Sequence, residues 1–433
     1  MNQLATADQK FLWHPFTQQQ GWEQETPLII ERAQGSELID VDGNSYIDGT
    51  ASLWCNVHGH RHPVIDKAVR DQLERVAHTT MLGLTHPPAI ELAKRLVEIA
   101  PAGLTRVFYS DSGSTATEIA VKIAYQYWQQ CDQPERTKFI ALKDAYHGDT
   151  VGSVSVGGIE LFHSLYRPLL FDTFKAEPGD IAGMEALLAE HAKQTAAVII
   201  EPLVQGAAGM IIHPQGYLRA VRELCDKYDV LLICDEVATG FGRTGTMFAC
   251  EQEDVAPDLL CLAKGITGGY LPLAATLTTE RLYAGFFGEH TDYRTFFHGH
   301  TYTGNPLACA AAIASLDVFE QEQTLTHVAA LDALLEILMA TVARIPCVGE
   351  IRRRGVMCGI EMIGFAPSTR AGHQVTLEAR KRGAIIRPLG DVIVLNPPLN
   401  ISFEQLGELV KITAESIIAV QQQLLDAIEV PAE

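Results

Sequence analysis

The sequence predicts an α/β protein with a mostly parallel sheet in a large domain and a small α+β domain at its C-terminal end. Short apolar runs alternate with longer segments of helical period from about residue 105 onward, which is typical of parallel strands covered by helices. After Pro306, two long helical stretches come before further strands, and 433 residues are too many for one ordinary core. We therefore expect two units of unequal size.

The N-terminal region is expected to contain a small antiparallel sheet at residues 27–48. Its sequence, PLIIERAQGSELIDVDGNSYID, contains two β-rich runs and a turn at Asp42-Gly43. We interpret this sheet as an N-terminal attachment to the larger units.

Five apolar runs predict the strands of the large domain, in the order RVFYS, KFIAL, AAVIIEP, VLLICD and DLLCLAK. Such runs are typical of a sheet that is buried on both faces. Further along we expect strands in VGEIRRRGVMCGIEMI, a helix, strands in AIIRPL and DVIVLNPP, and a final amphipathic helix. The small domain therefore begins near residue 320, without a linker of biased composition to mark the boundary.

Composition excludes two classes of function. The chain has 53 acidic and 33 basic residues and a net charge of −20, which opposes the phosphate backbone of nucleic acid. No stretch reaches the roughly 18 uninterrupted apolar residues of a membrane helix, and MNQLATADQKF lacks the order of a signal peptide. The nine cysteines are never in C-x-x-C spacing, as in reduced proteins. We expect a soluble cytoplasmic protein that binds neither nucleic acid nor membrane.

One lysine has an unusual setting, LAKGITGGYLP at residues 262–272. No charged residue other than Lys264 lies between Asp258 and Glu280. The lysine follows the apolar run DLLCL, so it lies at the end of a buried strand, where open α/β sheets bind ligands. An ordinary lysine is neutral in about one molecule in 2,500 at pH 7, so an apolar setting favours a nucleophile. The alternative is a lysine whose amine reaches solvent from a strand end.

Three further segments could serve a phosphate-bearing cofactor. Asp235 ends the buried run VLLICD, and its carboxylate could partner the protonated ring nitrogen of pyridoxal phosphate. Residues 110–114, SDSGS, precede a helix whose first N–H groups could bind a phosphate. Tyr146, in KDAYHGDT, could stack on a flat cofactor. Taken alone, these features could also be a turn cap, an ordinary helix N-cap and a core aromatic residue.

Two other motifs are interpreted as structural. GFGRTG at residues 240–245 matches G-x-G-x-x-G, but five residues separate it from the preceding strand and no apolar helix follows, so we reject dinucleotide binding. HGHRHP at residues 58–63 alternates like a metal-binding strand, but no Asp, Glu or Cys cluster accompanies it. We predict no metal site there or at the second H-x-H motif, residues 298–300.

In combination these segments resemble the class III aminotransferases, which are fold-type I enzymes that depend on pyridoxal phosphate. The motifs DSGS, YHGD, EPLVQGAAGM, DEVATGFGRTG, LAKGITGG and HGHTYTGNPLACAAA occur in that order. Within the class, LWHPFTQ, YQYWQ, YHGDT and IIRPLGDVIVLNPP are similar to the diaminopelargonic acid synthase branch of biotin biosynthesis. The resemblance implies a small domain built from both chain ends, with residues 1–60 joining it, residues 61–319 forming the large cofactor domain, and residues 320–433 completing it.

The resemblance also implies roles by position. Lys264 is the expected Schiff-base lysine, Asp235 the partner of the pyridine nitrogen, and Tyr146 the ring stacked on the cofactor, and these three are the expected catalytic residues. The implied cofactor-binding residues are Gly113, Ser114, Tyr146, Asp235, Val237, Lys264, His300 and Thr301. The first two would bind the phosphate, and Val237 would cover the ring face opposite the tyrosine.

Substrate and partner contacts are implied in the same way. The implied substrate-binding residues are Phe16, Leu53, Trp54, Tyr146, Lys264, Gly299 and Arg387. Arg387 would receive the carboxylate of the keto substrate, which its planar fork suits. His300 and Thr301 match positions whose neighbours reach the phosphate of the other subunit's cofactor, so the resemblance implies a homodimer with sites at the interface.

The implied reaction is transamination of 8-amino-7-oxononanoate to 7,8-diaminononanoate by a ping-pong route, with Lys264 as the base. Members that use S-adenosylmethionine as amino donor commonly carry Tyr, Trp and Pro where this chain has Phe16, Leu53 and His300. These departures resemble the branch that uses L-lysine and favour lysine as the donor. The alternatives are another class III aminotransferase acting on an ω-amino acid or diamine, an aminomutase or racemase of this fold, and a catalytically silent binding protein.

Overall fold

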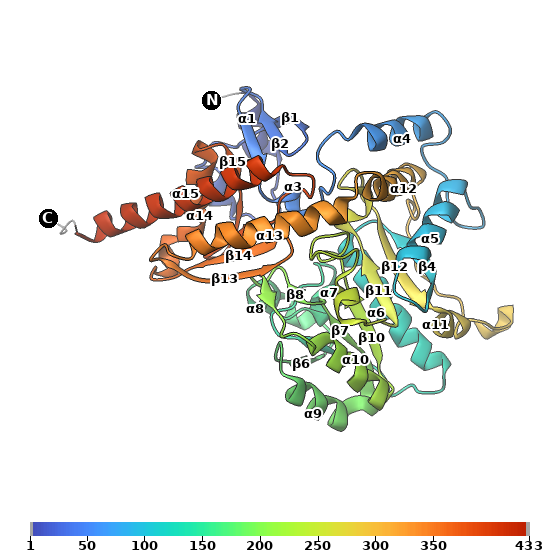
Figure 1. Ribbon diagram of the computed structural model, residues 1–433. Coiled ribbons are helices and arrows are strands. Elements are labelled where there is room, and N and C mark those ends of the chain that lie inside the picture. The colour runs from blue at the N-terminus through green and yellow to red at the C-terminus, as the bar shows by residue number, and fades with distance from the viewer. Residues whose placement is uncertain (1–2, 430–433) are drawn as a thin grey trace.

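The computed structural model describes residues 3–429 and has a seven-stranded sheet at its centre (Figure 1). In spatial order its strands are β4 (Leu104–Ser110), β12 (Ala274–Thr279), β11 (Leu259–Leu262), β10 (Leu231–Asp235), β7 (Thr195–Ile200), β5 (Lys138–Leu142) and β6 (Phe174–Ala176). Six strands run in one direction, and β12 is antiparallel to β4 and β11. The prediction of a mostly parallel sheet is confirmed, although the apolar runs taken as strands omitted β6 and β12.

Alternate residues of the central strands pack on opposite faces of this sheet. In β10, Leu231 and Ile233 belong to the apolar cluster of α6, whereas Leu232 and Cys234 belong to the cluster of α5, α9 and α10. Burial of both faces explains why the strands are continuous apolar runs. The covering helices are α5 (Pro87–Ile99), α6 (Gly113–Gln130), α9 (Ile181–His191) and α10 (Tyr217–Tyr228).

Two four-stranded sheets lie beside the central one, and each includes C-terminal strands (Figure 1). The first has the order β1 (Ile30–Gln34), β2 (Glu37–Asp40), β3 (Ser45–Asp48) and β15 (Ala384–Ile385). Its first three strands are antiparallel, as predicted, and β15 pairs with β3 in parallel, so segments near both chain ends share one sheet. The second has the order β13 (Val348–Arg354), β14 (Met357–Met362), β17 (Val392–Leu395) and β16 (Arg387–Leu389). A short hairpin pairs β8 (Val204–Gln205) with β9 (Ile211–Ile212).

The C-terminal strands are covered by α13 (Thr324–Val342), α14 (Ala371–Lys381) and α15 (Phe403–Glu429). Within residues 3–429, α13 is the one helix that is long and apolar enough to cross a membrane. Core helices of globular proteins share these properties, and α13 packs on α15 and β13. The other helices are α1 (Gln3–Phe11), α2 (Gln19–Trp22), α3 (Ala51–Trp54), α4 (Pro63–Leu73), α7 (Val151–Val156), α8 (Glu160–His163), α11 (Glu280–Ala284) and α12 (Pro306–Gln321). The division of the chain at residues 60 and 319 stays a prediction.

The carboxyl ends of the parallel strands meet at one edge of the central sheet. The residues that end β4, β5, β7, β10 and β11 are Ser110, Leu142, Ile200, Asp235 and Leu262. The five loops that follow these residues start close together, at the edge where open α/β sheets bind ligands.

Candidate active site

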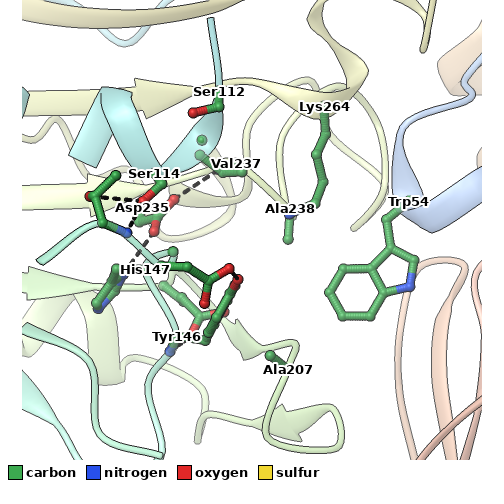
Figure 2. Close-up of a pocket in the computed structure, with 15 residues that line it drawn as sticks. Trp54, Ser112, Ser114, Tyr146, His147, Ala207, Asp235, Val237, Ala238 and Lys264 are labelled. Atoms are coloured by element: carbon green, nitrogen blue, oxygen red, sulfur yellow. Dashed lines mark hydrogen bonds and ion pairs between the residues drawn. The ribbon is translucent and has the colours of Figure 1, made fainter. Parts of the chain in front are cut away.

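A cavity of about 470 Å³ lies at this edge, and Figure 2 shows the side chains that surround it. Its walls are Trp54, Ser112, Gly113, Ser114, Tyr146, His147, Gly148, Asp149, Thr150, Glu201, Ala207, Asp235, Val237, Ala238 and Lys264. Apart from Trp54, they lie at the carboxyl ends of the parallel strands or in the segments that follow them, including the start of α6. The structure thus brings together seven residues expected from the sequence, Trp54, Gly113, Ser114, Tyr146, Asp235, Val237 and Lys264.

The start of α6 forms one wall of the cavity. Ser112 is the N-cap, and its side chain accepts a hydrogen bond from the N–H of Thr115. The N–H groups of Gly113 and Ser114 have no acceptor among the described residues, as is usual in the first helical turn. These free donors and the helix dipole favour an anion at this point.

Two glycines allow the loops to approach each other closely here. A Cβ on Gly113 would lie 2.5 Å from Cγ1 of Val237, and a Cβ on Gly148 would lie 2.4 Å from the Ser114 side chain. Gly148 also has a φ of +115°, which disfavours other residues. The N–H of Thr150 donates to Oγ of Ser114 at 2.9 Å, which fixes the loop after β5 against α6.

Asp235 is held in a defined orientation although it is only 4% exposed. Its Oδ1 accepts from the N–H of Val237 at 3.0 Å, and its Oδ2 accepts from Nδ1 of His147 at 2.7 Å. The other ring nitrogen of His147, Nε2, is buried and has no hydrogen-bond partner among residues 3–429. The sequence reasoning missed His147, although it stands next to Tyr146 in the same loop. We interpret it as a positioning residue for the Asp235 carboxylate.

Lys264 enters the cavity from the opposite side, near Trp54 (Figure 2). It lies two residues past β11 with a φ of +42°, and its Nζ is 5.5 Å from the centroid of the Trp54 ring. Burial lowers the pKa of its amine, although the carboxylates of Asp235 and Glu201 oppose that shift. The side chain is half-buried and points into the cavity (Figure 2), which fits a reactive amine better than a lysine on the outer surface.

Glu201 directly follows β7 and was also missed, although an acid after a buried strand is the signal that identified Asp235. Its side chain accepts hydrogen bonds from the N–H groups of Tyr146 and Gly206, both at 3.0 Å. Burial raises its pKa from 4.5 to about 7, an effect that Asp235 adds to and His147 opposes. Glu201 therefore changes its charge near neutral pH beside the cavity.

Replacing Glu201 with glutamine should reduce the dependence of stability on pH. The raised pKa in the folded state means that the stabilising contribution of the neutral acid is complete below pH 4.5 and is lost as the pH rises through about 7. Between pH 4.5 and about 7, ionisation of Glu201 should lower the wild-type free energy of unfolding by about 3 kcal/mol. Glu201→Gln should not show this decrease. Urea unfolding at pH 4.5 and above pH 7 measures how much each protein's free energy of unfolding depends on pH. The surface variant Glu74→Gln is the control and should behave like the wild type. The same pH dependence in the wild type and in Glu201→Gln would contradict the assignment.

Trp54 reaches the cavity from a left-handed turn at residues 51–54. All four residues have positive φ, between 47° and 74°, and none is glycine; such a conformation costs about 1–2 kcal/mol per residue. The wholly buried carboxylate of Asp48 stabilises the turn by accepting from the N–H of Ser52 at 3.1 Å and from its hydroxyl at 2.9 Å. His60 donates from Nε2 to the same carboxylate at 3.0 Å.

Each histidine of the motif at residues 58–63 has a partner within the protein. His58 contacts Ser315 through Nε2 at 3.1 Å, His60 binds Asp48, and His62 contacts Glu322 at 2.9 Å. No group of three or more potential metal ligands occurs in the part of the chain that the structure describes.

The glycine motif at residues 240–245 holds other segments of the chain through one of its side chains. Arg243 within it is buried and donates to the carbonyl oxygens of Asn56 and Pro397 and to Oδ1 of Asn396. The side chain therefore connects segments near the two ends of the chain, and no long helix follows the motif that could bind a dinucleotide phosphate.

Six expected residues do not line this cavity: Phe16, Leu53, Gly299, His300, Thr301 and Arg387. Phe16 lines a second cavity. Arg387, on β16, is half-buried, and burial lowers its pKa. Its guanidinium has no hydrogen bond or ion pair to any residue in the range 3–429, so it is free to bind a carboxylate. Gly299 and Thr301 are exposed.

The residues of the cavity fit pyridoxal phosphate. The free N–H groups at the start of α6 would hold its phosphate, and the Asp235 carboxylate would hold its protonated pyridine nitrogen. Tyr146 and Val237 would cover the ring, and Lys264 offers the amine for the aldehyde.

Comparison with known proteins agrees with this arrangement. The family profile described as aminotransferase class-III matches residues 18–417. The adenosylmethionine-8-amino-7-oxononanoate aminotransferase of Nitratidesulfovibrio vulgaris is 57% identical over 98% of this chain and 83% of its own length. The crystal structure of the enzyme with that name from Methanocaldococcus jannaschii is 44% identical, with a TM-score of 0.95 over 96% of this chain and 99% of its own.

A third relative connects the fold with its cofactor. An amine transaminase from an uncultivated Pseudomonas species, solved in a pyridoxal-phosphate-bound form, is 36% identical, with a TM-score of 0.88 over 94% of this chain and 98% of its own. The first two relatives are named for adenosylmethionine, so the sequence-based preference for lysine as donor is not supported. The chain belongs to the class III aminotransferases, a fold-type I family of enzymes that use pyridoxal phosphate.

Proposed function

We propose that the chain transfers an amino group from S-adenosylmethionine to 8-amino-7-oxononanoate and so forms 7,8-diaminononanoate in biotin biosynthesis. The observation that carries the proposal is the convergence of Lys264, Asp235 and the free N–H groups of α6 on one cavity. The names of relatives that are 57% and 44% identical over almost the whole chain support the choice of substrates.

Lys264 and Asp235 have separate chemical roles in this proposal. When bound, pyridoxal phosphate supplies an electron sink for negative charge at the donor carbon. Lys264 would hold the cofactor through Nζ and would also take the proton from the donor carbon, a role that its lowered pKa favours. Asp235 would hold the protonated pyridine nitrogen, and His147 keeps the Asp235 carboxylate in place.

The remaining residues bind and orient. Tyr146 and Val237 restrict the cofactor ring and exclude water from its faces. The unpaired guanidinium of Arg387 receives the carboxylate of the keto substrate. Because donor and acceptor use the same lysine in turn, the kinetics should be ping-pong.

We further propose a cytoplasmic homodimer. Gly299, His300 and Thr301 lie outside the cavity of their own chain, which is consistent with a role at the site of a second subunit. All nine cysteines are free thiols, as is usual in a reducing compartment.

The test of the proposed function is a pair of half-reactions. The holoenzyme is mixed separately with S-adenosylmethionine and with L-lysine, and absorbance reports the conversion of the cofactor to its amine form. We expect conversion by S-adenosylmethionine and none by lysine. The amine form should then react with 8-amino-7-oxononanoate; if that acceptor gives no turnover, the rival assignment, a class III enzyme for ω-amino acids or diamines, is favoured.

A further inference from the structure

The cofactor cavity offers few positive charges to a phosphate group. Among the described residues that line it, Lys264 is the only lysine or arginine, and its amine is the group expected to bind the aldehyde. The phosphate must therefore be held by neutral donors, the N–H groups at the start of α6 and the hydroxyl of Ser114. A hydroxyl proton rotates to suit its surroundings, so this donor serves the phosphate best when its direction is fixed before binding.

The hydroxyl of Ser114 is fixed by Thr150, in the segment that follows β5. The N–H of Thr150 donates to Oγ of Ser114 at 2.9 Å, and the hydroxyl oxygens of the two residues are also 2.9 Å apart. Because Oγ accepts from this N–H, the Ser114 proton points away from it, either to the Thr150 oxygen or to an anion in the cavity. The direction of the Ser114 hydroxyl thus depends on where Thr150 is held.

Thr150 is held in turn by Glu118, one turn further along α6. Thr150 is the N-cap of α7, and its hydroxyl donates to Oε2 of Glu118 at 2.6 Å. The N–H of Ser153, in the first turn of α7, donates to the same oxygen at 3.2 Å. Glu118 therefore caps α7 from a neighbouring helix, where the N–H groups of the first turn lack partners within their own helix and favour a carboxylate.

Packing leaves the Glu118 carboxylate little freedom to move. A Cβ on Gly152 would lie 2.3 Å from Oε1 of Glu118, so the first turn of α7 lies directly against this group. Ser153 adds a second connection between the helices, because its hydroxyl donates to the carbonyl oxygen of Ser114 at 2.9 Å. A continuous chain of contacts therefore runs from Glu118 through Thr150 to the Ser114 hydroxyl.

We propose that Glu118 is a positioning residue for the cofactor phosphate, because it holds Thr150 where the Ser114 hydroxyl can direct its proton at that group. Glu118 acts as a hydrogen-bond acceptor, and a direct contact between its carboxylate and a phosphate would be repulsive. The proposal rests on the assignment, made above, of the phosphate to the start of α6. Glu118 should therefore affect the affinity for a cofactor that carries a phosphate and not for one that lacks it.

The first experiment compares pyridoxal phosphate with pyridoxal, which lacks the phosphate but keeps the aldehyde for Lys264. Full-length holoenzyme is dialysed free of cofactor and titrated with each compound, and absorbance reports binding. Glu118→Ala should raise the dissociation constant for pyridoxal phosphate about tenfold and leave that for pyridoxal within about twofold. An equal rise for both compounds would overturn the proposal, because it would indicate general damage to the cavity.

Three further variants control this comparison. Glu118→Gln keeps an acceptor oxygen for Thr150 and should stay within about threefold of the wild type for both compounds. Glu223→Ala, which removes an exposed acid on α10, should match the wild type. Thr150→Val keeps the N–H but has no hydroxyl for Glu118, and it covers the case in which Glu118→Ala does not fold. It should show the same selective loss of affinity for pyridoxal phosphate.

The second experiment asks whether Glu118 acts through Ser114. Ser114→Ala should weaken the binding of pyridoxal phosphate about tenfold. Adding Glu118→Ala to it should weaken binding by less than about a further twofold, because residues that act through one contact are not additive. Losses that multiply would overturn the proposal and leave the phosphate assignment intact. If Ser114→Ala binds pyridoxal phosphate as tightly as the wild type, the phosphate assignment fails and the proposal fails with it.

Discussion

Replacing Lys264 with alanine should abolish transamination while the protein still binds its cofactor. The variant loses the covalent link and also the base that takes the proton from the donor carbon. General bases alone contribute about 10²–10⁴-fold, so the rate should fall at least about a thousandfold. The absorption band of the lysine-bound cofactor should be absent from the purified protein, because no other lysine lines the cavity.

The measurement combines a spectrum of the purified variant with single-turnover rates. Lys67→Ala is the matched control, because Lys67 is exposed and pairs with Asp71 on the surface of α4. Added methylamine should restore part of the rate of Lys264→Ala, since a free amine can take over the proton transfer. Full activity of Lys264→Ala without an added amine would disprove the assignment.

The sequence reasoning singled out Asp235 because it ends a buried strand and Lys264 because it lies just past one. In a sheet that is covered on both faces, apolar residues continue until the strand ends, so the first polar residue is conspicuous. Glu201 follows β7 in the same way and could have been found from that signal. The segment proposed to bind phosphate, residues 110–114, could be recognised because a helix N-cap has a local signature.

Contacts between distant parts of the chain were not predictable in this way. His147 and Asp235 are 88 residues apart, and only the packing of the loops after β5 and β10 makes them partners. The left-handed turn that carries Trp54 has no glycine to indicate it. It depends on the buried Asp48, whose carboxylate also binds His60 of the apparent metal motif. The preference for lysine as donor, which the names of the relatives do not support, has a related weakness, because three single positions were read without the cavity around them.

Replacing Asp235 with asparagine should have the second largest effect on catalysis. The amide keeps the shape of the side chain but has no charge, so it no longer stabilises the proton on the pyridine nitrogen. The loss of one preoriented electrostatic partner costs about 10²–10³-fold in rate. Single-turnover conversion by S-adenosylmethionine measures the loss, with Asp229→Asn as the control because Asp229 lies on the surface, at the end of α10.

A cofactor analogue can separate the charge of Asp235 from its part in packing. If the carboxylate acts by keeping the ring nitrogen protonated, an analogue methylated at that nitrogen carries the positive charge permanently and should restore much of the lost rate in Asp235→Ala, where the shorter side chain leaves room for the methyl group. If the carboxylate instead serves mainly to hold His147 in place, the analogue should restore nothing, and His147→Leu should be as slow as the Asp235 variants. Rescue by the analogue together with a milder effect of His147→Leu would establish that the histidine acts through the aspartate, and that the charge at the end of β10 is what the reaction needs.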